Sequence, residues 1–70
     1  MNATLLKSQI VLNDKKILDV AKQLKISRSA LYRKLNSETE FTRHEIEVLI
    51  NYLNLSVDIA MEIFFNEKVA

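Results

Sequence analysis

Residues 17–36, with the sequence ILDVAKQLKISRSALYRKLN, decide the fold of this 70-residue chain. Four apolar residues in the first part follow the i, i+3, i+4, i+7 spacing of an amphipathic helix. They are Ile17, Val20, Ala21 and Leu24. Asn13 or Asp14 is expected to cap this helix, because short polar side chains satisfy free N–H groups at a helix start. The pattern breaks at Lys25-Ile26.

A second helix is expected directly after this break, over about residues 28–36. Ser27 has the side chain of a helix N-cap. Ala30, Leu31 and Leu35 form an apolar stripe that one side of the helix can bury. The two helices are therefore separated by only about three residues, with the small Ala21 placed where the second helix crosses the first.

The remainder of the chain also shows helical periodicity. A short helix is expected near residues 3–12, and Thr42 with Glu45 three positions later has the pattern of a capping box at the start of another. Asn36, which tolerates the left-handed conformation, and Asn54 are expected to end helices. Ser56 is expected to cap a last helix over about 57–65. The sequence thus predicts an all-α fold, a compact bundle of five short helices forming one domain over residues 1–70.

The composition excludes several classes of protein. The chain has no Cys, Gly or Pro, so disulfides, thiolate metal sites and Gly-rich phosphate loops are absent. No apolar run approaches the roughly 20 residues of a membrane span, and no apolar signal core is seen, so a cytoplasmic location is expected. His44 is the only histidine and no nucleophile–base pair is visible. We therefore expect no enzyme activity, metal, cofactor or small-molecule substrate.

The net charge of +1 conceals two oppositely charged halves. Residues 1–36 carry eight Lys or Arg against two Asp, a charge of +6, and residues 37–70 carry two against seven acids, a charge of −5. This asymmetry favours a polyanion as partner of the first half, although scattered surface charge alone is also possible.

Two helices joined by a tight turn, as expected over 17–36, are typical of the helix-turn-helix, whose second helix enters the DNA major groove. The sequences AKQLKISRSALYRKLN, FTRHEI and LNLS resemble the Cro- and repressor-type helix-turn-helix proteins of bacteriophages and prophages, over roughly residues 5–65. The resemblance implies a regulator that binds double-stranded operator DNA as a repressor. Two positions depart from the family pattern. Lys25 stands where the family usually has Gly, so the turn is either altered or strained, and Lys34 is expected to extend to solvent.

The candidate DNA-contacting residues follow from these expectations. The outward face of the second helix is expected to hold the base-reading residues, namely Arg28, Ser29, Tyr32 and Arg33. Phosphate contacts are expected from residues at helix ends and in the loop, namely Lys16, Ser27, Asn36, Thr42 and Arg43. A simple solvated helix face is the alternative interpretation of the outward residues.

The last helix is apolar on most sides, and five short helices cannot cover all of it. The sequence does not decide which stripe faces the core. The surplus at Ile59, Ile63, Phe65 and Val69 is a candidate homodimer surface, and a core that wraps more of the helix is the alternative. A second candidate function is a protein-interaction module that binds a partner repressor through this helix.

Overall fold

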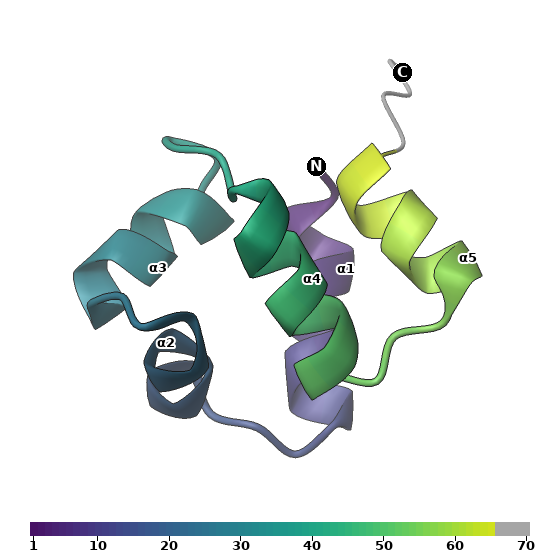
Figure 1. Ribbon diagram of the computed structural model, residues 1–70, viewed down its shortest axis with the longest axis horizontal. Coiled ribbons are helices and arrows are strands. Elements are labelled where there is room, and N and C mark those ends of the chain that lie inside the picture. Colours follow the sequence, from purple (N-terminus) through teal and green to yellow (C-terminus); the bar gives the residue numbers. More distant parts are fainter. Residues whose placement is uncertain (66–70) are drawn as a thin grey trace.

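The computed structural model describes residues 1–65 of the chain. Over these residues all regular structure is helical, which confirms the predicted all-α class. The elements are α1 (Ala3–Leu12), α2 (Ile17–Leu24), α3 (Arg28–Leu35), α4 (Arg43–Tyr52), α5 (Val57–Ala60) and a π-helical turn η1 (Met61–Phe65) (Figure 1). None of the described helices is long and apolar enough to cross a membrane.

Helix α4 runs through the middle of the molecule (Figure 1). α2 and α3 lie on one side of it, α5 lies on the other, and α1 lies behind. One apolar cluster joins all of these elements; its buried members are Leu6, Ile10, Val20, Ala21, Leu24, Leu31, Leu35, Leu49, Leu53, Leu55, Ala60 and Ile63. The backbone N–H of Asn2 donates to the Ile63 carbonyl at 2.8 Å, which holds the two ends of the described chain together.

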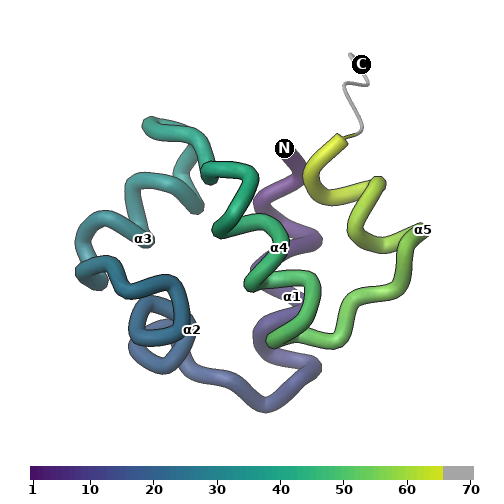
Figure 2. Tube along the Cα trace, viewed as in Figure 1, coloured from purple at the N-terminus to yellow at the C-terminus, as the bar shows by residue number. Residues whose placement is uncertain are grey.

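α2 and α3 are joined by three residues, Lys25 to Ser27. The Cα trace shows α2 nearly end-on while α3 runs across the view, so the two helices are steeply inclined (Figure 2). Ala21 is only 1% exposed and α2 packs against both α3 and α4. Ala21 thus lies in the core on a helix that packs on two others, and a close crossing of α3 at this residue stays a prediction.

Four helices end without glycine in the left-handed conformation that glycine normally adopts. The left-handed residues are Asp14, Lys25, Ser37 and Asn54, with φ of 60°, 59°, 64° and 52°. In each case the next residue donates its N–H to a carbonyl five positions back, at 2.9 to 3.1 Å, which is the Schellman pattern. Asn36 is the C-cap of α3, as expected, but its φ is −89° and the left-handed conformation is adopted by the next residue, Ser37.

The predicted N-caps are confirmed at three helices and wrong at one. The hydroxyls of Ser27, Thr42 and Ser56 each accept the N–H three residues later. α2 begins after Lys16 and has no side-chain cap. Asn13 and Asp14 do not cap it because both belong to the end of α1: the Asn13 amide donates to the Gln9 carbonyl at 2.8 Å, and Asp14 is the left-handed residue.

Candidate nucleic-acid interface

α3 has two chemically distinct sides. Successive residues of an α-helix are rotated by about 100°, so the outward residues span an arc of about 140°. They are Arg28, Ser29, Tyr32, Arg33 and Asn36, and all are exposed. The opposite arc holds Ala30, Leu31, Lys34 and Leu35, of which the two leucines are fully buried. The four predicted base-reading residues therefore share one exposed face.

This face is positively charged and contains no acid. Arg28 and Arg33 are both exposed, and in the described part of the chain neither forms an ion pair. Tyr32 is 47% exposed between them, at i+4 from Arg28. The arginine side chains are thus free to present their planar donor forks to an external acceptor.

Ser27 lies at the start of α3, where the first N–H groups have no carbonyl partner within the helix. Its hydroxyl accepts the Ala30 N–H at 3.0 Å. The N–H groups of Arg28 and Ser29, at the first two helical positions, still point out of the helix end. This end has the donors and the dipole that bind an anion.

The inward side of α3 carries one charged residue, Lys34, whose side chain is only 13% exposed. Its Nζ lies 3.0 Å from Glu45 Oε1, donates to the Glu40 carbonyl at 2.9 Å and sits 5.7 Å from the centre of the Phe41 ring. The expectation that Lys34 would extend to solvent is therefore wrong. The carboxylate of Glu45 holds Lys34 in this position. The sequence pattern did not identify Glu45 as the partner of Lys34.

Glu45 completes a capping box at the start of α4. Its Oε1 accepts the Thr42 N–H at 2.9 Å, and Thr42 Oγ1 accepts the Glu45 N–H at 3.1 Å. Burial acts to raise the pKa of Glu45, but hydrogen bonds from Thr42 and Lys34 and the charge of Lys34 outweigh burial. The pKa therefore lies below its ordinary value, and Glu45 is ionised at neutral pH.

The same contacts bring the start of α4 next to the end of α3. Arg43 is exposed and is paired only loosely with Glu47, at 3.9 Å. Asn36, the C-cap of α3, is also exposed. Among the predicted phosphate contacts, Thr42 is linked to α3 through Glu45 and Lys34, and Asn36 and Arg43 are exposed at the adjoining helix ends.

Lys16 stands apart from this group. It is exposed at the start of α2, the end of the helix opposite the turn that leads to α3. Eight helical residues, or about 12 Å of rise, separate it from that turn. Two further exposed lysines, Lys22 and Lys25, lie near the turn.

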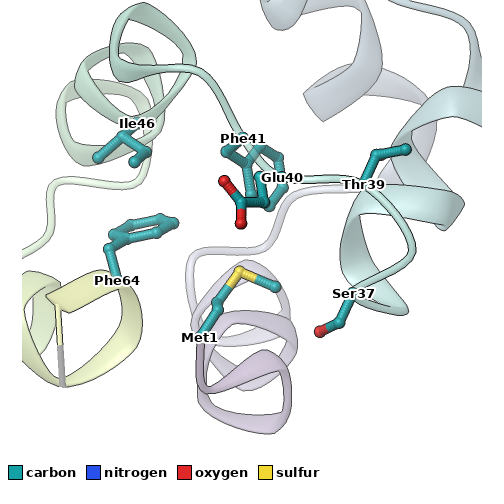
Figure 3. Close-up of a pocket in the computed structure, with 7 residues that line it drawn as sticks. All are labelled: Met1, Ser37, Thr39, Glu40, Phe41, Ile46 and Phe64. Carbon is teal, nitrogen blue, oxygen red and sulfur yellow. The ribbon is translucent and has the colours of Figure 1, made fainter. Parts of the chain in front are cut away.

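A cavity of about 290 Å³ lies behind the loop that follows α3 (Figure 3). Its seven lining residues include none from α3. They are Met1, Ser37, Thr39, Glu40, Phe41, Ile46 and Phe64. The Phe41 and Phe64 rings meet edge to face with centroids 6.1 Å apart, which joins the loop to η1. The cavity is therefore separate from the outward face of α3.

The predicted dimer surface on the C-terminal helix differs from the surface that the structure exposes. Ile63 is fully buried in the core, and Ile59 packs partly buried against it. The expectation that Ile63 is exposed for dimerisation is wrong, because α5 and η1 turn this stripe toward the other helices. Phe65 is 52% exposed, and Val69 lies outside the described residues.

A different apolar stripe faces outward on the same helix. Val57, Met61 and Phe65 follow one another at intervals of four residues and are 78%, 52% and 52% exposed. Asp58 and Glu62 lie beside them along the helix. This stripe, which we call the C-terminal stripe, is the apolar surface that the described fold leaves uncovered on α5 and η1.

In residues 1–65 no cluster of three or more potential metal ligands is found, and His44 is exposed in the first turn of α4. No protein-family model matches the sequence, and neither curated proteins nor solved structures give a significant match.

Proposed function

We propose that this chain is a sequence-specific DNA-binding regulator in which α2 and α3 act as a helix-turn-helix. The observation that carries the proposal is the division of α3 into a buried side and an exposed side holding Arg28, Ser29, Tyr32 and Arg33. A steeply inclined helix pair with a three-residue connection can present such a face to the major groove.

The outward residues suit base recognition. An arginine fork pairs with the O6 and N7 acceptors of guanine, which contributes about 1–3 kcal/mol of discrimination per pair. Arg28 and Arg33 are proposed in this role. Ser29 offers a hydroxyl to a base edge, and Tyr32 offers a ring and a hydroxyl between the two arginines.

The helix ends suit phosphate. In α4 the N-cap N–H of Thr42 is occupied by Glu45, whereas the N–H groups of Arg43 and His44 have no carbonyl within the helix. These two groups, the Thr42 hydroxyl and the Arg43 side chain are the proposed donors. Ser27, Asn36 and Lys16 are proposed to add contacts at the two ends of α3 and at the start of α2.

One helix of eight residues contacts few base pairs, so we propose that two copies bind a two-fold symmetric site. Half-sites would then be one DNA turn, about 34–36 Å, apart. Among the described residues, we propose the C-terminal stripe, and not the buried Ile63, as the contact between the two copies. Such a protein would act in the cytoplasm as a repressor of the Cro-like phage type, by occupying a promoter.

Selection of bound sequences from a random double-stranded DNA pool at moderate salt tests the proposal. We expect enrichment of a site with two-fold symmetry, and an affinity that falls steeply with salt because neutralised phosphates release counterions. A folded protein that enriches no sequence would contradict it. A single enriched half-site would contradict only the dimer.

A second candidate function is favoured by the C-terminal stripe. Three large apolar side chains exposed on one helix face are a feature of surfaces that bind another protein. In that case α5 and η1 would dock on a partner regulator with little dependence on salt. Met61→Asp would abolish partner binding in a pull-down while leaving DNA binding by the monomer unchanged.

A further inference from the structure

Lys34 differs from the other cations of the basic half. Its side chain is 13% exposed, and its ammonium group contacts Glu45, the Glu40 carbonyl and the face of Phe41. These contacts engage two of the three N–H donors of the ammonium group and place it beside the Phe41 ring. Lys34 is therefore engaged by internal partners, although it lies on the helix proposed to read DNA.

A single oxygen, Glu45 Oε1, accepts hydrogen bonds from two elements. It binds the Thr42 N–H at the cap of α4 and Lys34 Nζ on α3. α3 packs mainly on α2. The ion pair is thus a direct and directional link between the end of α3 and the start of α4, whereas apolar contacts have no preferred direction.

The ion pair also determines the charge at the start of α4. Glu45 belongs to the first helical turn, close to the Arg43 and His44 N–H groups that are proposed to bind phosphate. An unpaired carboxylate at this place would repel a phosphate group. The ammonium of Lys34 at 3.0 Å compensates that charge.

We propose that Lys34 is a positioning residue for DNA reading, which acts through Glu45 to hold the base-reading face of α3 and the phosphate-binding end of α4 in one fixed relation. The proposal rests on the proposed DNA-binding function. In this role the buried Lys34–Glu45 ion pair sets the geometry of the site without touching the DNA.

The test uses the double variant Lys34→Met/Glu45→Gln, which keeps the net charge and the approximate side-chain volumes. Its matched control is Lys22→Met/Glu47→Gln, the same two changes at exposed positions of α2 and α4. The probes are the selected operator and a random duplex of equal length. We expect the ratio of operator to random affinity to fall about tenfold in the first variant, the contribution of one good base contact, and to stay within about twofold of the parent in the control. Affinity for random DNA should not change, because the net charge does not.

Three results would overturn the proposal, and they are distinguishable. If the folded double variant keeps the parent's ratio, the ion pair does not position the reading face, while the DNA-binding function stands. If the control loses as much discrimination as the variant, the effect is not specific to the buried pair. If the parent selects no sequence at all, the proposed function fails and this proposal fails with it.

Two single variants extend the test to the case in which the double variant does not fold. Glu45→Gln removes the charge of the carboxylate but keeps an oxygen for the Thr42 N–H, and we expect an intermediate loss of discrimination. Lys34→Arg keeps the positive charge and should retain most of the ratio. Equal ratios in parent, Glu45→Gln and Lys34→Arg would also overturn the proposal.

Discussion

Lys34 Nζ lies 3.0 Å from Glu45 Oε1, with both side chains almost removed from solvent at 13% and 12% exposure. The pair joins a helix of the basic half to a helix of the acidic half. Arg43 and Glu47, which form another ion pair on α4, are 3.9 Å apart and largely exposed, so they contribute little. The two ion pairs therefore differ in burial: Lys34–Glu45 is shielded from solvent, whereas Arg43–Glu47 is not.

Replacing Glu45 should make stability less dependent on pH in the acid range. The pKa of Glu45 lies below its ordinary value of 4.5 in the folded chain, so the unfolded chain binds this proton more tightly. The stabilisation is complete above about pH 4.5 and is lost as the pH falls through the folded pKa. Urea unfolding of parent and Glu45→Gln at pH 7 and pH 3 measures this. Equal losses of stability in the two proteins would show that Glu45 does not contribute.

Lys25→Gly should stabilise the fold. Lys25 has φ 59°, and the left-handed conformation costs a non-Gly residue roughly 1–2 kcal/mol. Since glycine also loses more chain entropy on folding, we expect a net gain of about 0.5–1 kcal/mol, or several degrees in Tm. The control is Gln23→Gly, in the exposed interior of α2, which should destabilise by about 0.5–1 kcal/mol. A loss of stability in Lys25→Gly would contradict the left-handed turn.

Arg33→Ala should reduce sequence discrimination more than affinity for random DNA. Arg33 is exposed on the outward face of α3 and has no ion-pair partner in residues 1–65. We expect a tenfold or greater loss on the operator, which corresponds to about 1.4 kcal/mol or more. Lys22→Ala is the control for loss of one positive charge. If Arg33→Ala weakens both duplexes equally, Arg33 contacts phosphate and does not read a base.

Ile63→Ala and Met61→Ala should differ strongly in stability although they lie two residues apart. Ile63 is fully buried, so its truncation leaves a cavity and should cost about 2–5 kcal/mol. Met61 is 52% exposed in the C-terminal stripe, and its truncation should cost less than about 1 kcal/mol. Chemical denaturation of the two variants measures the difference. Similar costs would mean that η1 is rotated relative to the core.

Much of the fold is predictable because its signals are local. Helical periodicity placed the helices at 3–12, 17–24 and 28–35 within a residue or two, and the side chains of Ser27, Thr42 and Ser56 marked helix starts. A cap acts on an N–H three residues away, and periodicity acts within one or two turns. These interactions are therefore visible in the order of residues alone.

Other features depend on contacts between distant residues. The outward face of α3 could be predicted from the spacing of the polar and apolar residues within that helix. The partner of Lys34 could not, because Glu45 is eleven residues away on another helix. The C-terminal helix is apolar on two sides, and only packing against α1 and the rest of the core shows that Ile63 is inside while Met61 and Phe65 are outside.

The sequence by itself determined where three of the helices begin, which face of α3 is polar and that the chain has a basic and an acidic half. Tertiary structure alone decided which charges remain free for a ligand and which apolar stripe remains exposed. The physical reason is that helix signals arise from neighbours along the chain, whereas desolvation of a lysine or an isoleucine depends on what the whole fold brings against it.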